Sequence, residues 1–464
     1  MIRKYPWYYF PWLYHVLKHW VRLGTKTYYR KVEQKGKKAY DPKGPKIIAV
    51  NHRNGLSDAI LIASLLREHP TFLTRADVFL KPLARKALNW LRMIPVYRSR
   101  DGVDVIQKNQ ETFQFCIDEL KDGNSVFIFP EGNHARKHRV RPLKKGLARI
   151  AFQAAEQSDF TLPLKIVPVG ITYSKYIEIY GNLLIWYGTP IDLEPYYPLY
   201  KENPRKALLE VTKALREALK EYTLHISLVE EYDFIDQMQK LYTVDHLGVK
   251  YLDRVSPSAQ LKASKEIVEK VEAKLSSDSK AFSEIRGELP YYFEDLERLA
   301  LRDHVIQRGP FSRQNLFIKG FGIFLLAPFF LISLIHHFWL YRFPYQFAIN
   351  KFKDDQWHQS ISMLFATFPA VPYHLILFGL VWWLTGSAVW ATIYISLVIA
   401  SGLLGLEMIR WWKRWRGDIR YMHLLRTKDS IAIGLAARRK KLVDVIRKNI
   451  QTPAPKPLSE GVGN

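Results

Sequence analysis

The chain has 464 residues, of which 48% are hydrophobic, so it is long enough for two or three domains with a sizeable core. Lys and Arg number 69 against 44 Asp and Glu, and the net charge of +25 indicates an anionic partner: nucleic acid, an anionic membrane or a phosphorylated substrate. The chain has a single cysteine, Cys116, so an intramolecular disulfide is excluded. The absence of such a disulfide is typical of proteins in a reducing compartment. The 13 Trp and 26 Tyr favour a membrane interface among these partners.

Residues 1–24 are rich in aromatic side chains. Pro6, Pro11, His15 and Lys18 interrupt the apolar run and no small-residue cleavage site follows, which distinguishes the segment from a signal peptide. The pattern predicts a retained helix that lies in the membrane interface. A helix that packs on the following domain is the alternative.

Residues 25–225 alternate short apolar runs with helical patterns. We expect strands at 46–50, 92–97, 124–130, 165–174 and 183–188, and helices at 58–66, 105–123, 146–158 and 204–223. This alternation predicts an α/β domain with a mixed, mostly parallel sheet flanked by helices.

A His–Asp pair separates the first predicted strand from the first predicted helix, in the segment "NHRNGLSD". In one interpretation Asp58 only caps the helix and His52 only packs. In the other, His52 accepts a proton from an alcohol, and Asp58 binds its second ring nitrogen and fixes the tautomer. The turn pair Asn54-Gly55 allows the two side chains to meet.

A second polar segment, Ile128–Phe152, begins at the end of a predicted strand and carries many cations after Pro130-Glu131-Gly132. Loops of this kind bind phosphate, and an anionic lipid surface is a second partner for the same charges. The cations are Arg136, Lys137, Arg139, Arg141, Lys144, Lys145 and Arg149, and no acidic residue lies among them.

Residues 226–318 read as charged amphipathic helices without catalytic signatures. In the following region, 319–410, residues 320–341 contain no Asp, Glu, Lys or Arg over 22 residues, and residues 361–406 contain none over 46. Because a spanning helix needs roughly 20 residues, the second run predicts two membrane helices, at 361–384 and 387–409. For 320–341, interrupted by Pro328, we expect a re-entrant or interfacial element rather than a full crossing. Residues 411–464 form a basic tail, and Lys and Arg at both ends of the helix pair predict cytoplasmic ends.

Four blocks of this sequence resemble the PlsC-like glycerolipid acyltransferases: "NHRNGLSD", "MIPVYRSRDG", "FPEG" and "IVPVG". They occur in the family's order, over about residues 15–225. The resemblance implies the PlsC-like acyltransferase fold, with a mixed, mostly parallel sheet. It also implies a membrane-bound enzyme that moves a fatty acyl group from a thioester to the hydroxyl of a glycerol phosphate.

The resemblance also implies roles for individual residues. His52 would be the general base and Asp58 its orienting carboxylate, while Arg98 would bind the acceptor phosphate. Glu131 and Gly132 would position the acceptor. The further substrate-binding candidates are Asn51, Arg136, Lys137 and Pro168, the last at the wall of the site.

Two features depart from the family pattern. Five residues separate His52 from Asp58, where the commonest spacing has four, and Asn133-His134 replaces the usual Thr-Arg after "FPEG". The missing arginine would be replaced by Arg136 or Lys137, with His134 as a further candidate. If neither residue replaces the arginine, we expect an acceptor head group that differs from the one usual in the family.

From these features we expect an O-acyltransferase that uses acyl-CoA or acyl-carrier protein as co-substrate and lysophosphatidic acid as acceptor, in phospholipid biosynthesis. No cofactor or metal is expected, since the sequence has no Cys/His cluster at metal-ligand spacing. The protein would be integral to the membrane, with its active site facing the cytoplasm. The alternatives are acylation of glycerol 3-phosphate, acylation of a non-glycerol lipid, and a silent scaffold. Nucleic-acid binding is disfavoured because no motif supports it.

Overall fold

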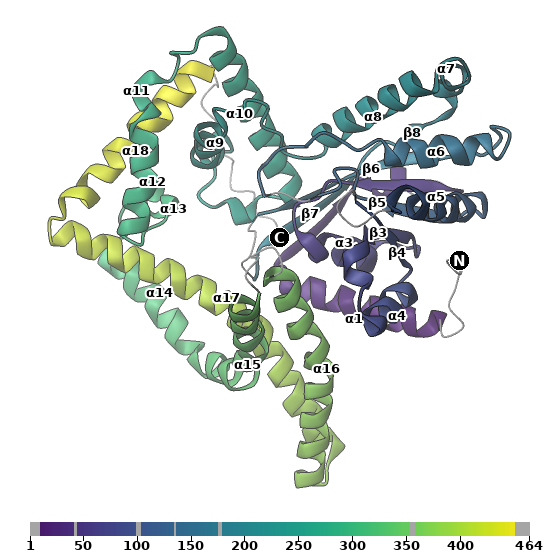
Figure 1. The fold of residues 1–464 in the computed structure, drawn as a ribbon. Coiled ribbons are helices and arrows are strands. Elements are labelled where there is room, and N and C mark those ends of the chain that lie inside the picture. Colours follow the sequence, from purple (N-terminus) through teal and green to yellow (C-terminus); the bar gives the residue numbers. More distant parts are fainter. Residues whose placement is uncertain are drawn as a thin grey trace. The chain divides into compact units, whose positions relative to one another are not determined.

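The computed structural model describes residues 10–40, 44–98, 104–133, 136–174, 179–352 and 358–450. They fall into two compact units (Figure 1). The first unit contains the described residues up to Leu224 together with those of Tyr345–Phe368, and the second contains His225–Pro344 and the described residues from Pro369 onward.

The first unit is built on an eight-stranded sheet with the order β1-β7-β6-β2-β5-β3-β4, and β8 pairs with β6. Among the strand pairs of the described residues, only β6–β7 and β6–β8 are antiparallel, so the expected mixed, mostly parallel sheet is confirmed. The strands are β1 (Lys31–Lys35), β2 (Lys46–Val50), β3 (Thr71–Arg75), β4 (Met93–Val96), β5 (Ser125–Ile128), β6 (Lys165–Tyr173), β7 (Asn182–Tyr187) and β8 (Ile191–Asp192).

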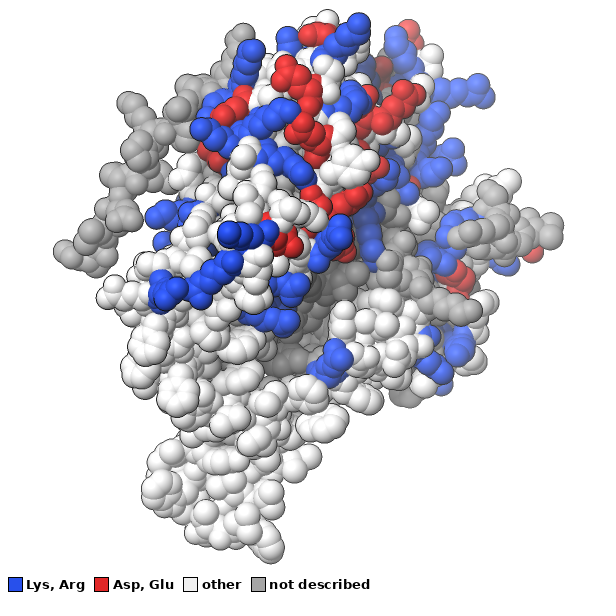
Figure 2. All heavy atoms as spheres, turned by 90° about the vertical axis from the view of Figure 1, so that its left-hand side faces the viewer, with Lys and Arg blue, Asp and Glu red and all other residues white. Residues whose placement is uncertain are grey.

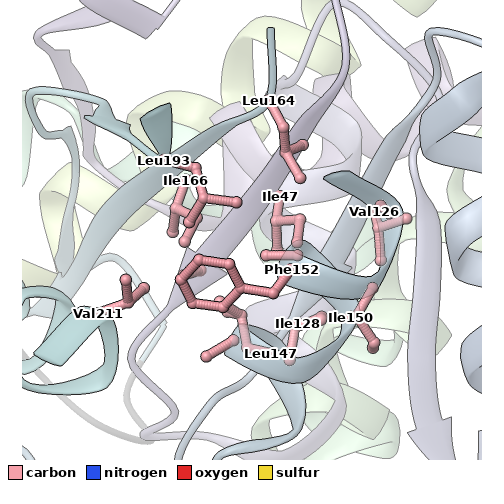
Figure 3. Close-up of a cluster of buried hydrophobic side chains, with 14 of the residues drawn as sticks. Ile47, Val126, Ile128, Leu147, Ile150, Phe152, Leu164, Ile166, Leu193 and Val211 are labelled. Carbon is pink, nitrogen blue, oxygen red and sulfur yellow. The ribbon is translucent and has the colours of Figure 1, made fainter. Parts of the chain in front are cut away.

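Helices cover both faces of this sheet. Along β2, Ile47 and Ala49 join a core cluster with α5, α6 and α8 (Figure 3), whereas Ile48 and Val50 face a second cluster with α3. A central parallel strand is buried on both faces, which explains its continuous apolar run. The helices are α1 (Pro11–Tyr28), α2 (Lys37–Tyr40), α3 (Gly55–Leu65), α4 (Pro82–Trp90), α5 (Val105–Lys121), α6 (Gly146–Glu156), α7 (Tyr197–Glu202) and α8 (Pro204–Glu221), with 3₁₀ turns η1 (Ala76–Phe79) and η3 (Glu194–Tyr196).

Helix α1 packs on α3 and buries Tyr14 and Tyr28, which is the alternative that the sequence left open. Its other side exposes Phe10, Trp12, Val16 and Leu23. An exposed apolar face of this kind also suits a membrane interface, so packing and interfacial location are compatible for this helix. The first nine residues of the predicted 1–24 segment lie outside the described part of the chain.

The second unit is helical. Helix α18 packs against α9, α10, α12 and α13, and its buried Arg439 forms ion pairs with Asp245 and Asp303. The elements are α9 (Tyr232–His246), η4 (Leu252–Arg254), α10 (Pro257–Ser277), α11 (Ser283–Arg286), α12 (Glu288–Arg298), α13 (Asp303–Arg308), α14 (Arg313–Leu325), α15 (Ala327–Lys351), α16 (His358–Thr385), α17 (Ala388–Arg426) and α18 (Ser430–Ile450); α15 and α16 each contribute part of their length to the first unit.

Two helices, α16 and α17, are long and apolar enough to cross a membrane, as the sequence predicts. Helices α14 and α15 pass the same test only as a pair bent by 52°. That residues 320–341 do not fully cross the membrane therefore stays a prediction. Charged side chains gather in the upper part of Figure 2, and the lower part of that view is almost free of them. The helices extend beyond the predicted spans: α17 continues to Arg426, and residues 430–450 of the predicted tail form α18.

Candidate active site

The candidate site residues follow the carboxyl ends of parallel strands. His52 follows β2 and Glu131 follows β5, and these strands are paired in parallel with Ala49 opposite Ile128. Parallel neighbours end at the same edge of a sheet, so the two loops meet there, although 79 residues separate them. Arg98 follows β4, which is joined to β5 through the parallel strand β3.

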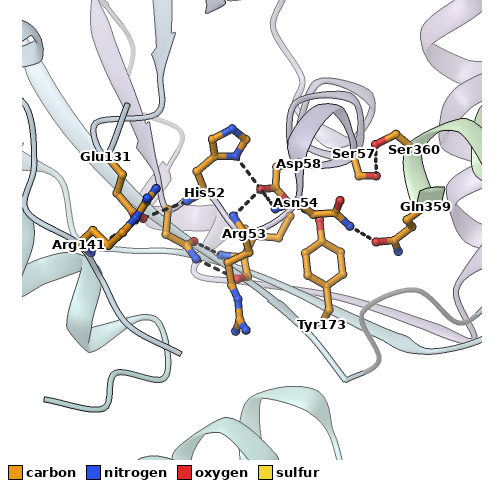
Figure 4. Close-up of polar contacts among 12 residues, drawn as sticks. His52, Arg53, Asn54, Ser57, Asp58, Glu131, Arg141, Tyr173, Gln359 and Ser360 are labelled. Atoms are coloured by element: carbon orange, nitrogen blue, oxygen red, sulfur yellow. Dashed lines mark hydrogen bonds and ion pairs between the residues drawn. The ribbon is translucent and has the colours of Figure 1, made fainter. Parts of the chain in front are cut away.

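His52 and Asp58 are in direct contact (Figure 4). The Nδ1 atom of His52 lies 2.9 Å from Oδ2 of Asp58, whose side chain is 0% exposed. The imidazole also stacks on Phe129, with ring centroids 3.8 Å apart. The five-residue spacing is accommodated because Asn54 is extended and α3 begins at Gly55, which carries Asp58 into the first helical turn.

Asp58 is held by three further hydrogen bonds. Its Oδ2 accepts the backbone N–H groups of Arg53 and Asn54, both at 2.8 Å, and its Oδ1 accepts the hydroxyl of Tyr173 at 2.5 Å. The two backbone contacts satisfy amides at the helix start, as a capping side chain does. The capping and orienting interpretations of Asp58 are therefore compatible, since one carboxylate performs both tasks.

Glu131 links the His52 loop to the basic loop. Its Oε1 accepts the backbone N–H of His52 at 3.1 Å, and its Oε2 accepts Nε of Arg141 at 3.1 Å. The Glu131 side chain is 3% exposed, so the ion pair with Arg141 compensates a buried charge.

These contacts define what the site can do chemically. A hydrogen bond from Nδ1–H to a carboxylate selects the imidazole tautomer that carries its lone pair on Nε2, where it can accept a proton from an alcohol. The buried carboxylate then stabilises the imidazolium that forms. Both groups lie at the edge of the sheet, next to cationic side chains that suit a phosphorylated substrate.

Comparison with known protein families gives one match. Residues 31–172 match the model of the family described as Acyltransferase. The chain carries an acyltransferase-family domain.

Among curated proteins, this domain is similar to glycerol-3-phosphate O-acyltransferase 2 of Saccharomyces cerevisiae, with 30% identity over 29% of this chain and 18% of the yeast protein. It is also similar to a chloroplastic 1-acyl-sn-glycerol-3-phosphate acyltransferase of Brassica napus, with 26% identity over 38% of this chain and 49% of that protein. The chain thus spans less than half the length of these two curated relatives. A solved structure, the 1-acyl-sn-glycerophosphate acyltransferase PlsC from Thermotoga maritima, matches with a TM-score of 0.33 and 22% identity, over 45% of this chain and 79% of that one.

Three of the predicted site residues, Asn51, Gly132 and Pro168, lie where they shape the backbone around the site. The side chain of Asn51 bonds both backbone groups of Ile171, at 2.7 and 3.2 Å. Pro168 is buried in β6 opposite Ala49, between the segments of β6 that pair with β8 and β7. Gly132 has a φ of +67°, which favours glycine at the turn after Glu131. These placements favour shaping of the site over direct contact with substrate for Asn51 and Pro168.

The predicted phosphate ligands lie in two places. Arg98 binds Asp77 through Nη2 at 3.2 Å. Arg136 lies in the basic loop, where its carbonyl oxygen accepts Nη2 of Arg53 at 2.5 Å, and Lys137 is exposed beside it. His134 and residues 99–102 of the second block lie outside the described part of the chain.

Sequence reasoning did not identify three site residues. Arg53 is 8% exposed and connects the His–Asp loop to His138 and the carbonyl of Arg136. Arg141 was only one of seven cations in its loop, and Tyr173 was only the penultimate residue of a predicted strand. For Arg141, the sole usable signal was its position ten residues after a glutamate that needs a buried partner.

Proposed function

We propose that the protein is a membrane-bound acyltransferase that transfers a fatty acyl group from acyl-CoA or acyl-carrier protein to the free hydroxyl of lysophosphatidic acid. The contact between His52 Nδ1 and Asp58 Oδ2 at 2.9 Å, inside an acyltransferase-family domain, carries this proposal. The product would be a diacylated glycerol phosphate for phospholipid synthesis.

In the proposed reaction, His52 is the general base. Nε2 takes the hydroxyl proton while the oxygen attacks the thioester carbonyl carbon, and Asp58 stabilises the resulting imidazolium. The tetrahedral intermediate then collapses, the C–S bond breaks, and the leaving thiolate takes the proton from His52. The acyl thioester is a co-substrate, and we propose that the reaction requires no cofactor or metal ion.

The acceptor phosphate would bind to the cations that surround this edge of the sheet. Arg98, Arg136 and Lys137 are the proposed ligands, because guanidinium and ammonium groups bind phosphate oxygens strongly. The membrane location is supported by α16 and α17, and the Lys and Arg at both ends of this helix pair support a cytoplasmic active site.

A second candidate is acylation of glycerol 3-phosphate. The similarity to a yeast protein named for that reaction favours it. The two candidates differ in whether the acceptor already carries an acyl chain, so they predict different acceptors for one catalytic pair.

The test uses the full chain in lipid vesicles, radiolabelled acyl-CoA and acyl-carrier protein, and a panel of acceptors. Lysophosphatidic acid is expected to be the best acceptor, and His52→Ala is expected to abolish transfer without releasing the protein from the membrane. Preference for glycerol 3-phosphate would select the second candidate. Transfer at the wild-type rate by His52→Ala would reject the catalytic assignment.

A further inference from the structure

A segment remote in sequence contacts the catalytic loop. The described residues of Tyr345–Phe368 belong to the first unit, and they include the first turns of α16. There Gln359 is 1% exposed and Ser360 is 0% exposed, while Met363 joins the core cluster that contains Ile48 and Leu61. Two polar side chains at the start of an apolar helix are therefore buried against the sheet unit.

Both polar side chains bind the first turn of α3 (Figure 4). Gln359 Oε1 accepts Nδ2 of Asn54, and the Oγ atoms of Ser360 and Ser57 lie 2.7 Å apart. Gln359 also donates through Nε2 to the hydroxyl of Tyr29 at 2.5 Å. This turn carries Asp58, and the backbone N–H of Asn54 is one of the donors to the Asp58 carboxylate.

The conformation of Asn54 depends on this contact. Asparagine at a helix N-cap usually binds the backbone amides of its own helix, but the side chain of Asn54 makes no such bond. Gln359 holds it instead. Because Asn54 is 0% exposed, loss of Gln359 would leave a buried amide donor without this acceptor and free the turn to rearrange.

The same helix is fixed a second time, two turns further on. Trp20 of α1 donates through Nε1 to the carbonyl of Thr367 at 3.0 Å. Gly24 approaches the Thr367 side chain so closely that an added Cβ would lie 2.3 Å from its Cγ2. The start of α16 therefore has little freedom to slide along the sheet unit.

We infer that Gln359 and Ser360 are positioning residues of the active site, through which the N-terminal turn of the candidate membrane helix α16 holds the His52–Asp58 pair in its reactive geometry. The inference rests on the proposed function. Gln359 and Ser360 lie outside residues 31–172, which match the family model, so the membrane segment supplies part of the support for the catalytic loop. Insertion of α16 would then also fix the active site at the membrane surface.

The test compares Gln359→Met and Ser360→Ala with the matched control Ser362→Ala in the full chain in vesicles. Ser362 lies on the same helix and is 7% exposed, but its hydroxyl has no hydrogen-bond partner among the described residues. We expect Gln359→Met to lower kcat about 10- to 100-fold with little change in the KM for acyl-CoA, since small displacements of a catalytic group have effects of this size. Ser360→Ala should show a smaller fall, and Ser362→Ala none.

A second readout does not depend on turnover. The rate at which diethylpyrocarbonate modifies His52, followed by peptide mass spectrometry across pH, reports the environment of the imidazole. We expect Gln359→Met to displace this pH profile and Ser362→Ala to leave it unchanged. Thermal unfolding identifies a variant that fails to fold, in which case Ser360→Ala carries the test.

The outcomes separate the two proposals. Wild-type kcat and an unchanged His52 profile in both Gln359→Met and Ser360→Ala, with His52→Ala inactive, would overturn the positioning role alone. An equal loss in Ser362→Ala would overturn it too, since general packing of α16 would explain the result. Full activity of His52→Ala would overturn the proposed function, while the modification profile would still test the contact between α16 and the loop.

Discussion

The carboxylate of Glu131 accepts the backbone N–H of His52 at 3.1 Å. One oxygen of this buried group thereby fixes the peptide that carries the proposed base, and the other binds Arg141. The "FPEG" glutamate thus positions His52 and the basic loop together. Because both contacts use the same carboxylate, their effects on activity should be coupled.

This coupling gives the first prediction. Glu131→Gln retains an acceptor for His52 but loses the charge that pairs with Arg141, so we expect kcat to fall about 10-fold, and Glu131→Ala should cost more than 100-fold. Arg141→Gln should match Glu131→Gln, and the double variant should be no worse than either single one. Steady-state kinetics of the wild type, Glu131→Gln, Arg141→Gln and the double variant measure this coupling. Strictly additive losses would contradict a shared contact.

The hydroxyl of Tyr173 supports Asp58 from β6. Tyr173→Phe removes the donor to Oδ1 of Asp58, and we expect about a 10-fold lower kcat together with a loss of stability of about 1 kcal/mol. The neighbouring Thr172→Val is the control, because the hydroxyl of Thr172 has no hydrogen-bond partner among the described residues. Equal behaviour of the two variants in kinetics and thermal unfolding would show that the contact with Asp58 is unimportant.

Close packing at Gly170 predicts an effect on stability. A Cβ at this position would lie 2.1 Å from the carbonyl oxygen of Tyr222, and a backbone atom has no rotamer with which to move away. We expect Gly170→Ala to destabilise the first unit by about 3 kcal/mol. Gly146→Ala, whose Cβ would meet Phe113 at an ordinary 3.5 Å, should be nearly neutral. Equal thermal unfolding of the two variants would contradict this.

His304 in α13 predicts a dependence of stability on pH in the second unit. Burial, reinforced by Arg414, Arg308 and Arg302, lowers the pKa of His304 from 6.5 to about 4. Between these values the unfolded chain binds a proton that the folded chain does not, so stability is lost as the pH falls from about 6.5 to about 4.

The size of this loss is on the order of 1–3 kcal/mol. His304→Gln should flatten the dependence, and replacement of the exposed His423 by Gln should leave it unchanged. Thermal unfolding followed between pH 7 and pH 4 tests this. A steeper dependence in His304→Gln than in the wild type would be the opposite of the expected sign.

The sequence predicted the parts of the fold that depend on local pattern. The apolar run at β2, the helix of α5 and the uncharged segments of α16 and α17 each produce a period or a length that identifies the element. Strands β1 and β3 were missed, because both are partly exposed and lack a continuous apolar run. The pairing of His52 with Asp58 was predictable because only one turn separates them.

The rest of the site depends on contacts between distant segments. Tyr173 reaches Asp58 across 115 residues and Gln359 reaches Asn54 across 305, and neither residue differs in its local sequence from an ordinary strand or helix position. The structure also returns Tyr345–Phe368 to the first unit, and the composition of the sequence does not indicate this return.

The sequence by itself determined strands β2, β5 and β6, the helix that begins with the His–Asp turn and the helices able to cross a membrane, because each is specified by neighbouring residues. Only the tertiary structure decided that Glu131, Tyr173, Gln359 and Ser360 bond to the His52–Asp58 loop, and that Arg141 bonds to Glu131. Their hydrogen bonds form only where the parallel order of the strands and the packing of α16 bring remote segments together, and no local propensity encodes that meeting.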